Sequence, residues 1–179
     1  MEDREKLILE KESDKEFIEV MQLRGIKQIV YETLIEEKGF HPEEVLIDPQ
    51  FILRLSTVEA TASIDFMLIL EGINFMVIRC VSSGIESWER SVIAFARAIT
   101  DYQIPYAVIT DGEQAKVIDV INNVFVQKSI QELITRQEAL SLKKDFQKIP
   151  FPDKKREKET RIIYAFEDIK CRPVKRDIS

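Results

Sequence analysis

The chain has 179 residues, of which 45% are hydrophobic and 32% charged, so we expect about one folded domain and exclude disorder throughout. No apolar run approaches the roughly 18 residues of a membrane helix, and the charged start lacks the apolar segment of a signal peptide, which predicts a cytoplasmic protein with no membrane partner. Two cysteines and one histidine nearly exclude a zinc site built from these residues.

The net charge of −6 is unevenly distributed along the chain. Residues 1–142 hold 14 basic and 25 acidic residues, whereas residues 143–179 hold 12 basic and 7 acidic ones. A basic tail on an acidic body can mark an electrostatic contact with nucleic acid, but it more often belongs to a solvated helical extension with mixed charges. Residues 149–152 (IPFP) are the best candidate boundary, so we expect an α/β domain over 1–148 and a basic helical extension over 149–179 that packs on it.

The first forty residues are predicted to be helical. Ser13 and Glu16 fit a capping box, which predicts a helix start, and Gly25 is placed to interrupt or bend that helix. A second helical run covers residues 26–38, and Gly39 is placed to end it in the left-handed conformation. Residues 41–44 then predict a turn with a short helical start.

The pattern changes to extended structure from residue 50. Bulky apolar runs at 50–55, 63–70 and 75–81 predict strands, and residues 71–74 between the last two predict a hairpin turn. The remaining pattern predicts, in chain order, a helix over 86–102, a strand over 106–110, a hairpin of 115–120 with 124–127, short helices within 130–147 and a helix over 153–168. This order predicts an α/β sandwich built on a mixed sheet.

Asp65 is the most informative residue, because it interrupts the apolar run 63–70. Burying an ionised carboxylate costs free energy unless the group is paired or binds a metal ion. Carboxylates hold the divalent cation in metal-dependent phosphodiester cleavage, usually with a second acid on the adjacent strand and a lysine two residues later. The alternative to a metal-binding role is a structural carboxylate that accepts hydrogen bonds from backbone N–H groups or pairs with an arginine.

Four segments carry a resemblance to a known family: residues 31–40 (YETLIEEKGF), 63–66 (SIDF), 75–81 (FMVIRCV) and 104–112 (IPYAVITDG). In order and spacing they resemble the N-terminal nuclease domain of type I restriction enzyme R subunits, in the PD-(D/E)XK nuclease superfamily. The resemblance implies a restriction-endonuclease-like mixed β-sheet flanked by helices, here with helical additions at both ends. It also implies DNA or restriction-system protein subunits as partners.

The departures from the family pattern concern the catalytic strand, which in the family reads apolar-apolar-Glu-x-Lys. Asp65 matches the metal-binding aspartate, but Arg79 stands at the Glu position and Val81 at the Lys position. Glu32 matches a helical acid that some relatives direct at the metal. Because arginine is always charged, Arg79 would repel a divalent cation, and we expect an ion pair between Asp65 and Arg79 in its place.

Three functions remain open from the sequence. The first is a stand-alone nuclease-fold protein that is catalytically degenerate, binds nucleic acid or a partner protein, and needs no cofactor. The second is an active Mg²⁺-dependent DNA endonuclease with a rearranged site, in which Asp65 holds the metal, Glu89 is a replacement acid, and Lys27 or Lys116 replaces the lost lysine. The third is a structural or interaction homodimer formed through the helical additions.

Overall fold

A computed structural model describes residues 2–171 of the chain, with side chains over residues 10–167. In chain order the elements are α1 (Glu2–Glu32), the π-helical turn η1 (Thr33–Glu37), the 3-10 turn η2 (Pro42–Glu44), β1 (Val45–Ile47), β2 (Gln50–Arg54), β3 (Glu59–Ser63), β4 (Phe66–Leu70), β5 (Ile73–Cys80), the 3-10 turn η3 (Ile85–Trp88), α2 (Glu89–Ala98), β6 (Tyr106–Thr110), β7 (Gln114–Asp119), β8 (Val124–Ser129), the 3-10 turn η4 (Ile130–Glu132), α3 (Arg136–Lys144) and α4 (Asp153–Cys171).

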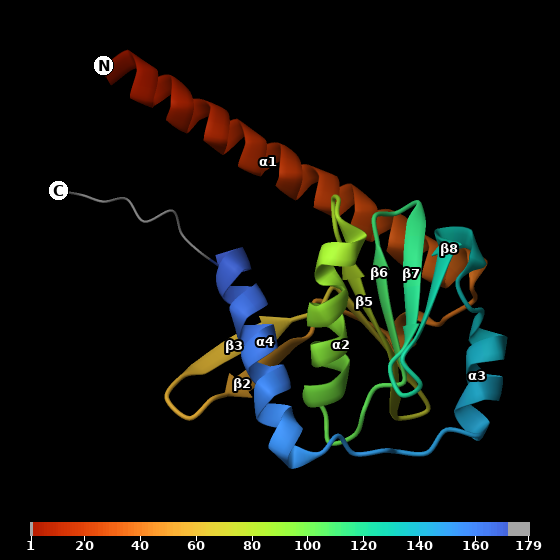
Figure 1. Cartoon of the computed structure of the whole chain (residues 1–179). Helices are drawn as coiled ribbons and strands as arrows, with labels where there is room; N and C mark the ends of the chain where they lie inside the picture. The colour runs from red at the N-terminus through yellow and green to blue at the C-terminus, as the bar shows by residue number, and fades with distance from the viewer. Residues whose placement is uncertain (1, 172–179) are drawn as a thin grey trace.

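Six strands form one mixed sheet in the order β1-β4-β5-β6-β7-β8. Neighbouring strands are antiparallel except β5 and β6, which run parallel and are connected through α2. Strands β2 and β3 form a separate antiparallel pair. The protein therefore has the mixed α/β fold that the element order predicts, with helices on both faces of the main sheet (Figure 1).

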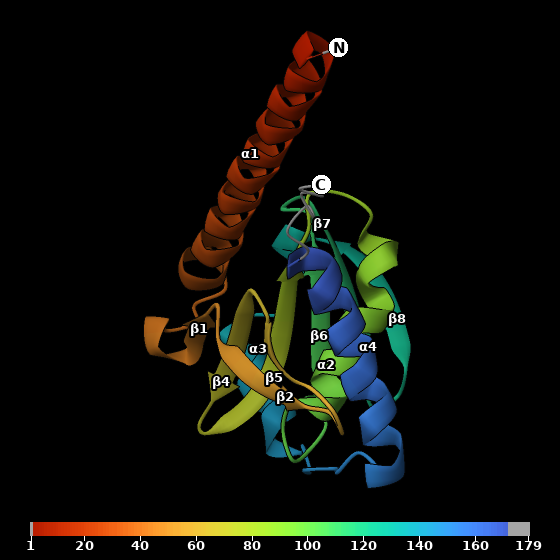
Figure 2. The same cartoon turned by 90° about the vertical axis from the view of Figure 1, so that its left-hand side faces the viewer.

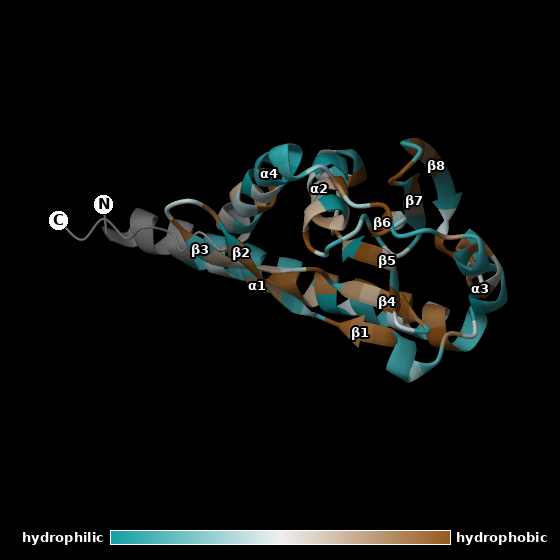
Figure 3. Cartoon of the chain, turned by 90° about the horizontal axis from the view of Figure 1, so that it is seen from below, coloured by the Kyte–Doolittle hydropathy of each residue, from teal (hydrophilic) through white to brown (hydrophobic). Residues whose placement is uncertain are grey.

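The main sheet separates two hydrophobic cores. On one face the sheet packs against α2, α4 and the β2–β3 pair, with Phe95 of α2 and Ile163 of α4 buried there. On the other face it packs against the end of α1, η1 and α3, with Val30 and Ala139 buried. Seen from below, α2 and α4 lie on one side of β4 and β5 (Figure 3). Coverage of both faces explains why the central strands are continuously apolar and do not alternate.

The N-terminal helix is longer than the sequence predicts. α1 continues through Ser13, Glu16 and Gly25 without a break, so the predicted start at Ser13 and the interruption at Gly25 are both wrong. A capping box is only a local preference, and the strong helix formers on both sides of Ser13 outweigh it. Residues 10–22 are exposed and only the last turns reach the body, so α1 projects from the molecule (Figure 2). Gly39 adopts the left-handed conformation as predicted, with φ of 75°.

Two short strands were not predicted, and one of them changes the position of Asp65. β3 ends at Ser63, and β4 begins only at Phe66. Asp65 therefore lies in the turn immediately before β4 and not inside a strand, which corrects the prediction from the run 63–70. The other missed strand, β1, pairs with β4 along the sheet edge. The helix predicted over 86–102 is shorter, because it begins as η3 and ends at Ala98.

The C-terminal helix α4 lies along α2 and against the β2–β3 pair (Figure 1). Its inner face carries Ile163 between two buried acids, Glu159 and Glu167. Glu159 accepts two hydrogen bonds from Arg90 of α2, at 2.6 and 2.9 Å, and lies 3.8 Å from Arg97. The part of the predicted extension that the structure describes is thus a helix that completes one core; residues 172–179 lie outside the described part. No helix among residues 2–171 is long and apolar enough to span a bilayer.

Candidate functional site

The pairing of β4 with β5 places Asp65 opposite Arg79. Phe66 pairs with Ile78, so the antiparallel ladder brings the residue before Phe66 opposite the residue after Ile78. The Asp65 Oδ2 atom lies 3.8 Å from the Arg79 Nη1 atom, and the expected ion pair is present. The turn before β4 and the end of β5 together form the core of the candidate site.

The Asp65 carboxylate is surrounded by donors. The backbone N–H of Cys80 donates a hydrogen bond to Oδ2 at 2.8 Å. Lys27 reaches in from α1, with its Nζ atom 3.7 Å from Oδ1, and also forms an ion pair with Asp48. The N–H of Asp48 donates to the backbone carbonyl of Asp65 at 3.0 Å, which fixes the turn that carries the carboxylate. Both carboxylate oxygens of Asp65 therefore face a positive or donor group.

Arg79 is almost completely buried, with 2% of its surface exposed. Its Nη2 atom donates to the carbonyl of Ser63 at 2.9 Å and to Glu167 Oε1 of α4 at 3.5 Å. Its guanidinium carbon lies 5.8 Å from the centre of the Trp88 ring, a favourable cation–π distance. The guanidinium is thus held between two acids, Asp65 and Glu167, although its Nε and Nη1 atoms have no hydrogen-bond acceptor.

The residues around Asp65 do not suit a divalent cation. Two positive groups, on Lys27 and Arg79, lie within 4 Å of its oxygens, where a metal site needs further acidic or carbonyl ligands. Within residues that the structure describes, no three His, Cys, Asp or Glu side chains are grouped so that they could hold a metal ion. The site is therefore a charge cluster of two cations and their acids.

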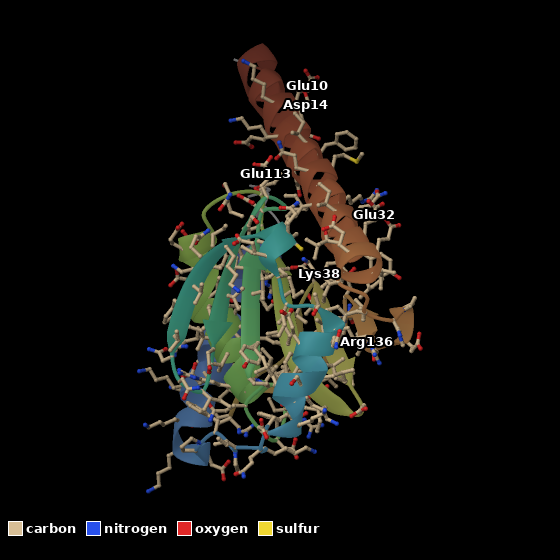
Figure 4. The ribbon with its side chains drawn as sticks, turned by 90° about the vertical axis from the view of Figure 1, so that its right-hand side faces the viewer. Glu10, Asp14, Glu32, Lys38, Glu113 and Arg136 are labelled. Atoms are coloured by element: carbon tan, nitrogen blue, oxygen red, sulfur yellow. The ribbon has the colours of Figure 1, made fainter. Side chains whose placement is uncertain are left out.

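The resemblance also assigned Glu32 and Val81 to the site. Glu32 is exposed near the base of α1 (Figure 4) and accepts a hydrogen bond from Gln28. No hydrogen bond or ion pair between described residues joins it to Asp65. Val81 is buried in the core beneath α2, and its N–H donates to the carbonyl of Thr110. Val81 has no polar group that could act on a molecule bound at Asp65.

Of the replacements suggested from sequence, only Lys27 reaches Asp65. Glu89 at the start of α2 forms an ion pair with Lys116 of β7, so each of these residues neutralises the other. Lys116 lies on the second strand along from β5, too far across the sheet for a shared site. Cys80 is also unsuited to nucleophilic chemistry, because burial raises the pKa of its thiol far above the ordinary value.

Sequence reasoning missed two members of the cluster, Asp48 and Glu167. Asp48 has a left-handed backbone, with φ of 49°, and no motif marks it. Glu167 is one of many acids in predicted helices. The only signal that it would be buried is its position four residues after Ile163, on the same side of α4. Their roles depend on contacts with residues far away in the sequence.

The outer face of α4 is basic. Lys154, Lys155, Lys158 and Arg161 are all exposed, and Arg161 pairs with Glu157 of the same helix. Lys154 and Lys158 lie four residues apart on one side of the helix. Because Glu167 of the same helix contacts Arg79, this basic face begins about 9 Å along the helix axis from the charge cluster.

One comparison with known proteins finds a family. A family model described as type I restriction enzyme R protein N terminus (HSDR_N) matches residues 25–133, which is more than half of the chain. The match includes Lys27, Asp65 and Arg79, but not most of α1 or any of α4. No curated protein and no solved structure matches the chain.

Proposed function

The chain belongs to the family of type I restriction enzyme R protein N termini, and we propose that it is a catalytically degenerate member that binds DNA without cleaving it. Restriction-system protein subunits are partners that the family membership also suggests. The observation that carries the proposal is the buried guanidinium of Arg79, placed 3.8 Å from the one surviving acid of the expected metal site.

Charge supports the loss of cleavage. A divalent cation at Asp65 would have to displace Lys27 and approach within a few ångströms of Arg79, which cannot lose its proton at any ordinary pH. In place of a metal ion, the two side chains themselves neutralise Asp65. The position of the family lysine is filled by Val81, which has no group that could orient water or stabilise a phosphate.

Charge also supports a contact with DNA through α4. The body of the protein is acidic, so a polyanion is repelled by most of its surface. The outer face of α4 carries three exposed lysines, and two of them, Lys154 and Lys158, have no acidic partner among the ion pairs of the described residues. A helix that presents such a row can contact successive phosphates, and binding of this kind weakens steeply as salt rises.

Cleavage is tested by nicking of supercoiled plasmid with Mg²⁺ or Mn²⁺. We expect the wild-type chain to convert no more plasmid than the Asp65→Asn variant, because the metal site is replaced by an ion pair. The variant, purified in the same way, controls for contaminating nucleases. Nicking by the wild type that disappears in Asp65→Asn would overturn the proposal and favour an active enzyme with a rearranged site.

DNA binding is tested with a double variant, Lys154→Gln/Lys158→Gln, on a short duplex at several salt concentrations. We expect its association constant to fall roughly tenfold and the slope of log K against log salt to shrink by about 1 to 2, because up to two phosphate contacts are lost. The matched control is Lys11→Gln/Lys15→Gln, another exposed pair four residues apart, on α1. Equal losses in both variants, or binding that is insensitive to salt, would contradict a specific role for α4.

A further inference from the structure

The projecting part of α1 carries a row of side chains that nothing in the described structure covers. Residues 10, 14, 17, 21, 24 and 28 are all exposed, and their spacing alternates between four and three. Such spacing places them in one stripe along the helix, as in the seam of a two-helix coiled coil. We call this stripe the α1 seam; its members are Glu10, Asp14, Phe17, Met21, Arg24 and Gln28.

The middle of the α1 seam is apolar. Phe17 is 66% exposed and Met21 49%, and Ile18 beside them is also exposed. A large aromatic ring and a thioether in contact with water on a projecting helix are costly, and their burial against another surface is favourable. Something of complementary shape is therefore expected to cover this part of α1.

The two ends of the α1 seam differ in charge. Glu10 and Asp14, on the half that rises clear of the body (Figure 4), are acidic, whereas Arg24 and Gln28 on the half nearer the body can donate hydrogen bonds. In an antiparallel pair of α1 helices, Phe17 meets Met21 and Asp14 meets Arg24. Two-fold symmetry repeats each contact, so the seam is self-complementary.

A parallel pair would be disfavoured by the same residues. It would place Asp14 against Asp14 and Arg24 against Arg24, and like charges at facing positions repel. The body does not obstruct an antiparallel partner either. At 3.6 residues per turn, Ile26 and Val30, which face the body, lie nearly opposite the seam.

We propose that α1 is a dimerisation helix, and that its seam binds the α1 seam of a second copy of this chain in antiparallel orientation. Each seam buries the Phe17 ring against Met21 of the other copy, a favourable contact between an aromatic ring and sulfur. The Asp14–Arg24 pairs on either side set the register and the direction. The two bodies then lie at opposite ends of the helix pair, which leaves α4 and the Asp65 cluster of each copy accessible.

Sedimentation of the full chain over a range of concentrations tests the proposal. Because the seam is short, we expect a dimer with a dissociation constant on the order of 10 μM. Phe17→Ala is expected to raise that constant roughly 30-fold, as loss of a central hot-spot residue does. Glu19→Ala, at an exposed position on the side of the helix opposite the seam, is the control and should leave the dissociation constant unchanged.

Charge exchange tests the antiparallel register. Asp14→Arg alone and Arg24→Asp alone are each expected to weaken the dimer, because each creates facing like charges. The double variant Asp14→Arg/Arg24→Asp restores opposite charges only in the antiparallel pair, so we expect it to recover the wild-type constant. A wild-type chain that stays monomeric well above 10 μM, or a double variant no tighter than the single ones, would overturn the proposal. Neither result depends on whether the protein binds DNA.

Discussion

Replacement of Arg79 by alanine is expected to lower the free energy of unfolding by about 3–5 kcal/mol, the range found when one partner of a buried ion pair is removed. The guanidinium is the charge that faces both Asp65 and Glu167 at the end of β5. Without it, Glu167, which is also buried, loses that cation, and Asp65 retains only Lys27 and the Cys80 N–H. Denaturant titration followed by circular dichroism measures the change.

Two further variants separate the charge effect from simple loss of packing. Arg79→Met keeps much of the volume against Trp88 but not the charge, so it should remain strongly destabilising. Adding Glu167→Gln removes one of the acids left behind, and we expect the double variant Arg79→Met/Glu167→Gln to recover at least about 1 kcal/mol relative to Arg79→Met alone.

The control for this series is an exposed ion pair. Arg54 lies 3.7 Å from Glu59 at the surface of the β2–β3 pair, and both side chains are largely solvated. Arg54→Ala should therefore cost no more than about 0.5 kcal/mol. If Arg79→Ala cost as little as Arg54→Ala, the charge cluster would not be a buried structural substitute for a metal site.

Replacement of Glu159 by alanine is expected to destabilise the protein by about 2–4 kcal/mol, and to do so first at α4. The Glu159 side chain is 5% exposed, and its carboxylate accepts two hydrogen bonds from Arg90 and lies 3.8 Å from Arg97. Removal leaves Arg97, whose Nε already lacks an acceptor, without its nearest acid. The loss of unfolding free energy is expected to be smaller than for a fully buried ion pair, because Arg90 is partly solvated and can regain hydrogen bonds to water.

Hydrogen exchange locates the effect of Glu159→Ala. Amides of α4 are expected to exchange much faster, whereas those of β5 and β6, at the centre of the sheet, should change less. Glu157→Ala is the matched control, because Glu157 is exposed and pairs only with Arg161 one turn away, a contact worth about 0.2–0.5 kcal/mol. Uniform loss of protection over the whole sheet would mean that α4 does not open separately from the body.

The two buried acids in these predictions, Glu159 and Glu167, belong to a helix that lies outside the residues matched to the family. Glu159 fastens α4 to α2, and Glu167 of the same helix lies 3.5 Å from the Arg79 guanidinium. The acid that pairs with Arg79 therefore comes from an element outside the matched residues. The charge cluster and α4 therefore depend on each other.

Local chemistry determined much of the fold. Several local predictions agree with the structure: the strand at 106–110, the hairpin around residues 122 and 123, the turn at 71–74 and the left-handed Gly39. Each of them follows from a run of apolar residues or from a turn residue close by in sequence. The resemblance to the family also rested on short segments in order, and the family match bears it out. The expected pair of Asp65 with Arg79 needed only the pairing of two neighbouring strands.

Tertiary structure alone decided the rest of the cluster. Lys27, Asp48 and Glu167 converge on two strand ends from α1, a turn and α4. The free energy of those contacts depends on burial and on partners that lie up to 88 residues away along the chain. The sequence could propose Glu89 and Lys116 for the same place, yet the sheet brings them to each other instead. A charged side chain carries no local signal of which opposite charge it will meet, because that choice is made by the packing of whole elements.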